Sequence, residues 1–266
     1  MFVKKKVVPF VLSSKNMYIC TDFEKKMLFD LIHIDETDST NALARSYTLQ
    51  GKGIVVWADY QTAGRGQGTN TWESARGENL TLSIRFRPES VKAAEQFIIS
   101  MAISVALTQT LDMLHGVSIK WPNDIYVGDR KICGILIENV LKGGSIKDCI
   151  IGIGLNVNQT HFVSDAPNPT SMAIESGSEH DRQQVLDSLL RNFGALLDHW
   201  DAEGLRRTYR QLLYRREGMF DYSDKDGLFR ASLAGVEDDG HLLLRDGEGR
   251  LRRYAFKEVN YRIKEL

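Results

Sequence analysis

The sequence is poor in cysteine and has no long apolar run, and each shortage excludes a class of protein. Its 266 residues include only three cysteines, Cys20, Cys133 and Cys149. They are odd in number and widely spaced, so they can build neither a disulfide framework nor a metal site of the CxxC type. No segment approaches the roughly 18 consecutive apolar residues that a membrane-spanning helix needs. We therefore expect a cytoplasmic protein that does not bind a membrane.

An excess of charge of either sign is also missing. The 34 Lys and Arg residues are balanced by 35 Asp and Glu residues, which gives a formal net charge of -1. Proteins whose main function is to bind nucleic acid have an excess of Lys and Arg, so we expect no nucleic-acid partner. With 42% hydrophobic residues, the chain can bury the core of one large domain or of two unequal domains.

The N-terminus imitates a secretion signal without meeting its requirements. Three lysines at positions 4–6 precede the apolar residues 7–12, but this run is short and Pro9 interrupts it. We interpret residues 1–33 as an N-terminal extension, with Met17 as an alternative start of translation.

Hydrophobic periodicity predicts helices and strands through most of the chain. The predicted helices cover residues 39–50, the stretch between 90 and 116, 181–200 and 205–213, and the predicted strands cover 53–60, 79–87, 119–127, 131–140 and 149–157. Thr37 and Asp38 are expected to open the first helix, and Gly51 to end it. The pair Gly128-Asp129 is expected to turn a hairpin.

After Tyr214 the pattern changes. Short β-type runs are separated by Asp-Gly pairs at 226–227, 239–240 and 246–247. Asp-Gly between apolar runs is a strong hairpin signal. We predict an α+β protein with one domain over residues 34–214 and a small antiparallel barrel over residues 215–266.

Three segments carry residues suited to chemistry, and the first is the loop Gly64-Arg65-Gly66-Gln67-Gly68. Three glycines within five residues let the backbone approach an anion closely, and an arginine held among them can clamp a carboxylate or phosphate. The loop lacks the Gly-Lys-Ser/Thr ending of a Walker loop, and its glycines do not have dinucleotide-fold spacing. An ordinary turn is the alternative interpretation.

The second segment is KWPND at 120–124, which is followed by Arg130 and Lys131. Pro122 within a strand-like run predicts an edge or a bulge, and such irregularities often aim side chains toward a site. A carboxylate and two or three cations on one hairpin suit an anionic substrate. A surface hairpin with solvated charges is the alternative.

The third segment is GIGLNVN at 152–158. Glycines within a β-branched run indicate that a neighbour or a ligand approaches the backbone closely. Asn156 then either hydrogen-bonds a base edge or forms a turn at the end of a strand.

Taken together, these segments resemble those of biotin protein ligases. The matching segments, in the order of the family, are ETDSTNALA at 36–44, YQTAGRGQG at 60–68, Trp72, KWPNDIYVGDRKICGILIE at 120–138 and GIGLNVN at 152–158. The resemblance extends from about Ile34 to the C-terminus. It implies a catalytic domain like that of class II aminoacyl-tRNA synthetases, with a mixed, mainly antiparallel sheet, followed by a small SH3-like barrel.

The resemblance also implies a role for individual residues. Those implied to bind biotin are Ser39, Thr40, Gln61, Gly64, Arg65, Gly66, Lys131 and Gly134. Those implied to bind ATP are Arg65, Gln67, Trp72, Asn123, Lys131 and Asn156, with Trp72 against adenine and Asn156 on the base edge. Arg65, Lys131 and Asp124 are implied to be catalytic: the two cations neutralise the carboxylate and the α-phosphate, and Asp124 organises Mg²⁺ and accepts a proton.

One position departs from the family's pattern. Many relatives have GRGRxGR, whereas here Gln67 replaces the second arginine and is followed by Gly68, Thr69 and Asn70. That arginine helps to hold the activated intermediate, so the clamp would rest more heavily on Arg65.

The activity that the resemblance implies has two steps. Biotin and ATP, with Mg²⁺, form biotinyl-5'-AMP, and the biotinyl group then passes to a lysine of a biotin carboxyl carrier protein of acetyl-CoA carboxylase or a related carboxylase. We expect the enzyme to be a monomer or a weak homodimer.

Three other functions deserve comparison. A lipoate or octanoate transferase shares the general fold, but none of the six histidines lies in the context of its motif. A biotin-sensing repressor carries an N-terminal DNA-binding module, for which residues 1–33 are too few. A catalytically silent binding module would not require both Arg65 and Lys131.

Overall fold

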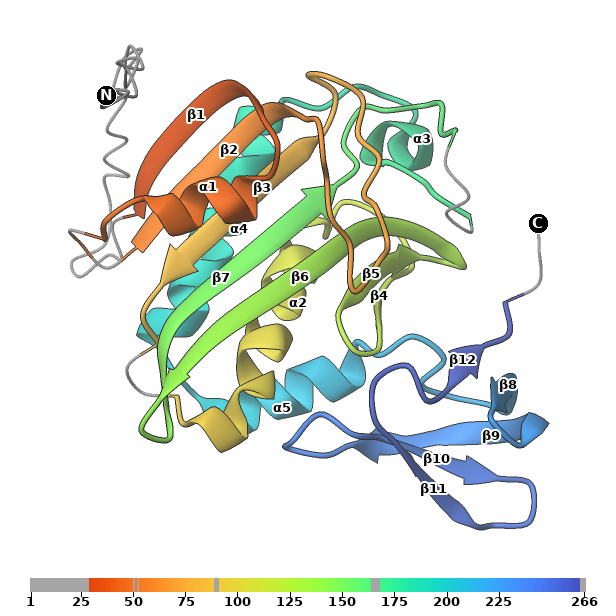
Figure 1. Cartoon of the computed structure of the whole chain (residues 1–266). Coiled ribbons are helices and arrows are strands. Elements are labelled where there is room, and N and C mark those ends of the chain that lie inside the picture. Colours follow the sequence, from red (N-terminus) through yellow and green to blue (C-terminus); the bar gives the residue numbers. More distant parts are fainter. Residues whose placement is uncertain (1–28, 50, 52, 89–90, 164–167, 264–266) are drawn as a thin grey trace, which may run out of the picture.

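The computed structural model describes residues 29–49, 51, 53–88, 91–163 and 168–263. Two sheets organise them (Figure 1): a seven-stranded sheet in the order β1-β2-β3-β7-β6-β5-β4 and a five-stranded sheet in the order β11-β10-β9-β8-β12. The strands of the large sheet are β1 (Phe29–Thr37), β2 (Gly53–Gln61), β3 (Leu80–Phe86), β4 (Val117–Lys120), β5 (Asp124–Val127), β6 (Arg130–Lys142) and β7 (Ser145–Leu155). The helices are α1 (Thr40–Ser46), α2 (Phe97–Thr110), α3 (Met172–Ser176), α4 (Arg182–Asp198) and α5 (Ala202–Gln211).

The large sheet is mixed and mainly antiparallel, as predicted. β1 pairs with β2 in parallel, and every other pair of neighbours in this sheet is antiparallel. Together with the second, antiparallel sheet, this confirms the predicted α+β class.

The hydrophobic core lies on one face of the large sheet. Ile151 and Ile153 of β7 point into it and pack with α2, which is buried around almost its whole circumference. Figure 1 shows α4 and α2 behind the sheet and α1 in front of it. Because side chains alternate along a strand, Gly152 and Gly154 face the opposite side. That opposite face, which lacks a full helical cover, is where the candidate site lies.

The predicted helix between residues 90 and 116 is shorter than expected. Residues 89–90 lie outside the described part, and Ala93–Glu95 form a separate 3₁₀ turn before α2 begins at Phe97. The backbone N–H of Ala93 donates to the carbonyl of Gly144, in the turn between β6 and β7. The pairing with that turn holds the preceding segment out of the helix. The amphipathic helix α4 matches its prediction, with Asp181 as its N-cap.

The helix predicted over residues 39–50 begins within one residue of its expected start, but its cap residue and its end differ from the prediction. β1 runs through Thr37, so the cap falls on Ser39, and α1 ends at Ser46. The Arg85 guanidinium of β3 donates to the backbone carbonyls of Ala44, Arg45 and Tyr47. A side chain distant in sequence therefore satisfies the free carbonyls at the helix end, the role that was assigned to a glycine C-cap.

The predicted single strand over residues 119–127 is two strands. β4 and β5 pair with each other, and Trp121, Pro122 and Asn123 form the turn between them, with a cis peptide bond before Pro122. Proline has no N–H to donate to a ladder, so the strand cannot continue through it. Pro122 was expected at an edge or a bulge, and it lies instead in the turn that follows β4, the edge strand of the sheet.

The N-terminal boundary also differs from the expected Ile34. β1 begins at Phe29, whose neighbour in β2 is Gly53, so the sheet already includes residues that were assigned to the extension. The leader at 4–12, the alternative start Met17 and Cys20 lie outside the described residues. Cys133 and Cys149 are free and buried, and burial raises the pKa of both thiols well above the usual range.

The small sheet consists of β8 (Phe220–Asp224), β9 (Gly227–Val236), β10 (Leu242–Asp246), β11 (Leu251–Tyr254) and β12 (Asn260–Tyr261). All its pairs are antiparallel, and the three Asp-Gly pairs lie where consecutive strands connect, as predicted, with Gly227 beginning β9 and Asp246 ending β10. The indole N–H of Trp121 donates to the carbonyl of Gly240 at 2.9 Å, which ties this sheet to the β4–β5 turn. No helix within the described ranges is long and apolar enough to cross a membrane.

Candidate functional site

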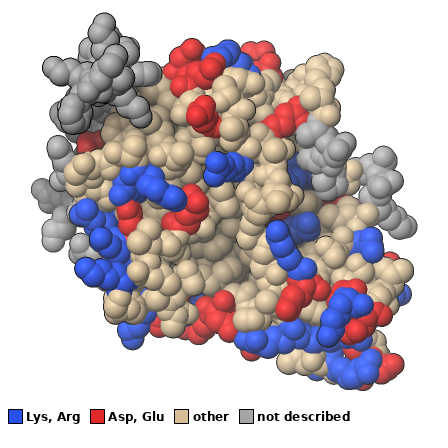
Figure 2. Space-filling model, in the orientation of Figure 1, with Lys and Arg blue, Asp and Glu red and all other residues tan. Residues whose placement is uncertain are grey.

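A cavity of about 780 Å³ opens on the face of the large sheet away from α2. Figure 2 shows this side of the molecule hollowed near its centre, with Lys and Arg atoms along the margin. The predicted site residues that line the cavity are Ser39, Thr40, Gln61, Arg65, Gly66, Gln67, Trp72, Asn123, Asp124, Lys131 and Gly134. They come from α1, β2, the β2–β3 loop, the β4–β5 turn and β6, so the fold brings together segments distant in sequence.

One end of the cavity is a compact network of hydrogen bonds. The Gln61 side-chain oxygen accepts from the backbone N–H of Thr40 at 2.8 Å and from its hydroxyl at 3.2 Å. Ser83, on the neighbouring β3, donates to the Thr40 hydroxyl oxygen at 2.7 Å or to the Asn41 amide oxygen at 2.6 Å. Ser39 and Thr40 are buried at the first turn of α1. This end can satisfy a small polar group that loses its water on binding.

Asn41 and Glu138 belong to the same end of the cavity but were not predicted from the sequence. The Asn41 amide donates to the Glu138 carboxylate at 2.8 Å, and Arg45 pairs with that carboxylate at 3.1 Å. Gly152 lies directly beneath, because a Cβ there would be 2.5 Å from the Asn41 oxygen. Asn41 is part of the segment 36–44, and its position one residue after Thr40 in a helix was the available signal.

The glycine-rich loop is a short hairpin rather than an irregular turn. Arg65 and Thr71 form an antiparallel bridge, and the N–H of Gly66 donates to the carbonyl of Asn70 at 2.8 Å. The N–H of Trp72 donates to the carbonyl of Gly64 at 3.0 Å, and this contact buries Gly64 below the cavity lining. A preformed hairpin holds the loop across the sheet; Figure 1 shows the segment between β2 and β3 crossing in front of β6.

Trp72 rests on a track of glycines in β6 and β7. A Cβ on Gly154 would lie 2.2 Å from the indole, and one on Gly134 would lie 2.8 Å from it. Gly134 and Gly154 are paired neighbours in the sheet, so their missing side chains form one flat patch. The indole N–H is buried without a partner among the described residues. Only glycine at both positions leaves room for a flat group against the backbone.

Lys131 and Asp124 form an ion pair beside the glycine track, where the Lys131 side chain lies 3.4 Å from the place that a Cβ on Gly134 would occupy. The Lys131 Nζ lies 2.8 Å from an Asp124 oxygen, and both side chains are about one quarter exposed, at 25% and 28%. The Lys131 ammonium also lies 5.8 Å from the centre of the Trp72 ring, within the range of a cation–π contact. The backbone of Lys131 is bonded on both sides to residues 168 and 170, which fixes the start of β6.

Lys120, the first residue of the KWPND segment, is a further cation of the site for which the sequence predicted no role. Burial lowers the pKa of its ammonium, as do Lys131 and Arg215 nearby, against the opposing effect of Asp124. Its Nζ donates to the Tyr126 hydroxyl at 3.3 Å. Three cations from separate segments, Arg65, Lys120 and Lys131, thus line one cavity. Arg65 has no ion-pair partner within the described part of the chain. Such an arrangement favours an anionic ligand.

Asn156 does not line the cavity. Its side chain is buried below, its amide donates to the carbonyl of Thr170 at 2.9 Å, and its side-chain oxygen has no partner among the residues described. The predicted hydrogen bond from Asn156 to a base edge requires that the base reach this side chain. The arrangement does not allow this while Trp72 covers the glycine track.

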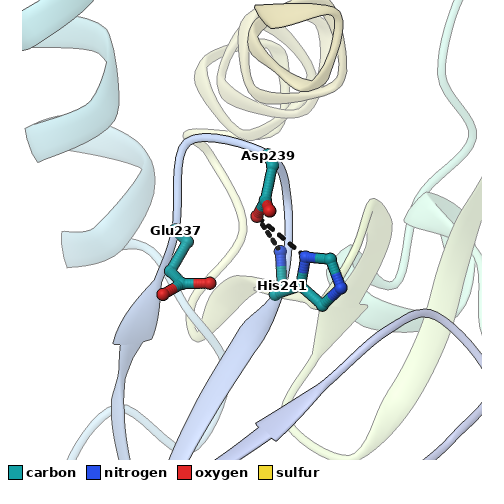
Figure 3. Close-up of side chains that lie close together, drawn as sticks. All are labelled: Glu237, Asp239 and His241. Carbon is teal, nitrogen blue, oxygen red and sulfur yellow. Dashed lines mark hydrogen bonds and ion pairs between the residues drawn. The ribbon is translucent and has the colours of Figure 1, made fainter. Parts of the chain in front are cut away.

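Metal ligation is possible at Asp124, whose carboxylate faces the cavity. Mg²⁺ usually takes one or two carboxylates together with substrate phosphates, so a single aspartate fits. Another cluster, Glu237, Asp239 and His241 in the small sheet, has its ligand atoms within 4.8 Å of one another (Figure 3). Arg253 already pairs with both Glu237 and Asp239 and offsets part of their charge, so we assign this cluster no metal.

Comparisons with known proteins agree with the geometry. Residues 32–156 match the biotin/lipoate A/B protein ligase family. Among curated relatives, the bifunctional ligase/repressor BirA of Escherichia coli is 32% identical over 238 residues, which cover 86% of this chain and 73% of the relative. A biotin–[acetyl-CoA-carboxylase] ligase of Paracoccus denitrificans is 30% identical over 233 residues, which cover 80% of this chain and 93% of the relative.

A solved structure has the same fold. The biotin protein ligase from Aquifex aeolicus in complex with biotin and ATP superposes with a TM-score of 0.71 at 25% identity, covering 88% of this chain and 99% of that one.

Proposed function

The chain belongs to the biotin protein ligase family and is an ATP-dependent biotin ligase, and we propose that it biotinylates a lysine of a biotin carboxyl carrier protein through a biotinyl-5'-AMP intermediate. Biotin and ATP are its substrates. The carrier protein of acetyl-CoA carboxylase or a related carboxylase is the acceptor that the names of the relatives favour.

The first step must overcome repulsion between two anions. A carboxylate oxygen of biotin attacks the α-phosphorus of ATP, the bond from that phosphorus to the bridging oxygen breaks, and pyrophosphate leaves. Arg65 and Lys131 both open onto the cavity and supply positive charge where the carboxylate and the phosphate meet. Fixed charges in a partly enclosed site stabilise such a transition state more than water does.

The cavity has separate places for the two ends of biotin. We assign the hydrogen-bonding end at Thr40, Gln61 and Ser39 to the ureido ring, which is uncharged and rich in donors and acceptors. The glycines of β6 and β7 then accept the flat body of the ligand, and the carboxylate points toward Lys131. Trp72 occupies part of the glycine track, so we propose that it moves when biotin enters and then covers the adenylate.

In the second step the carrier lysine attacks the acyl carbon of biotinyl-AMP, AMP leaves with the bridging oxygen, and an amide bond forms. The attacking amine must lose a proton, and Asp124 is the carboxylate at the reacting end that can accept it. The hairpin Gly64–Trp72 shields the mixed anhydride from water before the carrier arrives.

Magnesium fits this scheme at Asp124. The Asp124 carboxylate, with the Asn123 amide beside it, would hold the ion together with the phosphates of ATP. When bound, the ion would offset phosphate charge. We also propose that the small sheet is the SH3-like barrel of the family, that the boundary between the two domains lies near Tyr214, and that the enzyme works in the cytoplasm as a monomer or weak homodimer.

The observation that carries the proposal is that Arg65 and Lys131, from different segments, line one cavity together with the hydrogen-bonding end at Thr40 and Gln61. Mass spectrometry of a purified carrier domain incubated with the protein, ATP, Mg²⁺ and biotin tests it. One lysine should gain the mass of a biotinyl group, and lipoate or octanoate should not replace biotin. Modification with lipoate in place of biotin would contradict the assignment.

A further inference from the structure

The loop between β11 and β12 brings another cation to the glycine-rich hairpin. The Nζ of Lys257 lies 2.6 Å from the place that a Cβ on Gly68 would occupy. Gly68 itself has a φ of 70°, a left-handed conformation that suits glycine. The small C-terminal sheet therefore touches the hairpin at its outer end, beside the neutral Gln67.

Lys257 is held there in a conformation that a lysine rarely adopts. Its φ is also 70°, in the left-handed region where glycine and asparagine are the usual residues. A backbone outlier kept by its surroundings is a reason to look for a functional role. The adjacent Phe256 lines the cavity and packs against Trp121, with ring centres 6.1 Å apart. Trp121 in turn is bonded to Gly240, so the loop is anchored to the β4–β5 turn.

The ammonium of Lys257 forms no ion pair with the residues that the structure describes. Among the residues that the structure describes, its Nζ has no carboxylate partner and lies 5.9 Å from the centre of the Phe256 ring. Arg65, on the same hairpin, is likewise without an ion pair in the described part of the chain. The two unpaired cations, Arg65 and Lys257, lie on either side of Gln67, and the positive potential between them suits a phosphate group.

The position of Lys257 decides which phosphate it suits. Arg65 and Lys131 line the cavity, whereas Lys257 is exposed and lies outside the lining, at the mouth. In the reaction proposed above, the α-phosphate stays with the acyl group inside, and the β- and γ-phosphates leave as pyrophosphate. A cation at the mouth therefore meets the leaving group rather than the intermediate.

We propose that Lys257 binds the β- and γ-phosphates of ATP and the pyrophosphate product, so that the C-terminal sheet supplies part of the nucleotide site. This inference rests on the proposed biotin ligase reaction. It predicts a defect confined to the first half-reaction, because synthetic biotinyl-AMP carries no pyrophosphate.

The test compares the two half-reactions in full-length Lys257→Gly, Lys257→Arg and wild-type protein, with Lys225→Ala as the control. Glycine removes the charge and also accepts the left-handed φ, so the fold should not suffer. Lys225 is an exposed lysine in the β8–β9 turn of the same sheet. The readouts are biotin-dependent exchange of pyrophosphate into ATP, and transfer from synthetic biotinyl-AMP to a carrier domain.

For Lys257→Gly we expect the KM for ATP and the KM for pyrophosphate to rise about fivefold to tenfold, as for loss of one charge-assisted contact at an exposed site. The KM for biotin and the transfer from biotinyl-AMP should remain at wild-type values. Lys257→Arg should restore most of the ATP affinity, and Lys225→Ala should match the wild type. An unchanged KM for ATP, or an equal loss in both half-reactions, overturns the role of Lys257. Wild-type protein inactive in both half-reactions would instead refute the proposed function.

Discussion

The ammonium of Lys131 lies 2.8 Å from the carboxylate of Asp124, so the cation assigned to the first half-reaction and the base assigned to the second are ion-paired. The pair joins the end of the β4–β5 turn to the start of β6. The contact orients both side chains within the cavity that they line. An anionic substrate that binds Lys131 must then share its ammonium with Asp124. The ion pair therefore links the two steps of the reaction.

Replacing Lys131 should abolish most adenylate formation. Lys131→Ala removes a cation from the place where carboxylate and phosphate meet, and we expect biotin-dependent exchange of pyrophosphate into ATP to fall by about 10²- to 10³-fold. Lys142→Ala is the matched control, since Lys142 is at the exposed far end of the same strand. A near-normal exchange rate in Lys131→Ala, with the fold intact by circular dichroism, would defeat the assignment.

Neutralising Asp124 should impair both half-reactions. Asp124→Asn removes the proton acceptor and the partner of Lys131, so we expect transfer from synthetic biotinyl-AMP to fall by about 10²-fold or more and pyrophosphate exchange to fall as well. Asp112→Asn, at an exposed aspartate after α2, serves as the control. If the variant altered only the affinity for biotin, the role of Asp124 as a base would be wrong.

A methyl group on the glycine track should exclude ligand and indole alike. In Gly154→Ala the new Cβ would lie 2.2 Å from the Trp72 ring, a distance that forces the ring to move. We expect the affinity for biotin, measured by calorimetry, to fall at least about tenfold. Gly194→Ala is the control, because no atom lies within 4 Å of its added Cβ in α4. That control should bind biotin normally and be more stable by about 0.5–1 kcal/mol. Normal biotin binding by Gly154→Ala would remove the glycine track from the site.

The stability of the small sheet should depend on the charge of Asp246. Burial acts to raise the pKa of this carboxyl, but hydrogen bonds from Arg252, Arg250 and two backbone N–H groups outweigh it and lower the pKa from 3.8 to about 2. A folded-state pKa below the unfolded value contributes stability that is complete above pH 3.8 and is lost as the pH falls through about 2.

Asp246→Asn should therefore be less stable than the wild type at neutral pH, and the difference should shrink between about pH 4 and about pH 2. Urea unfolding of the full chain at several pH values measures it. A difference in unfolding free energy that stays constant over this range would contradict the account.

Local patterns predicted most of the architecture. The helix predicted over residues 181–200 and the three Asp-Gly turns depend on neighbours in sequence, and the structure contains them, the helix as α4. Tertiary contacts explain the errors. The end of α1 depends on Arg85, which is 40 residues or more from Arg45 and Ala44, so a local window of sequence does not contain both partners.

The sequence predicted those residues of the site that belong to recognisable motifs. The motif residues Arg65, Asp124 and Lys131 meet in one cavity, but the sequence could not place Asn156 beneath it. The sequence did not predict Glu138 as a site residue, because its role depends on a hydrogen bond from Asn41. That contact exists only because of the register of β6 against β7 and the position of α1 on the sheet.

The most direct test of the central claim is a crystal structure of the protein with a sulfamoyl analogue of biotinyl-AMP, in which a stable group replaces the acyl phosphate. The account predicts that this group contacts both Arg65 and Lys131, with the ureido ring at Thr40 and Gln61. An analogue bound elsewhere, or one that leaves either cation turned away from the acyl phosphate position, would contradict it.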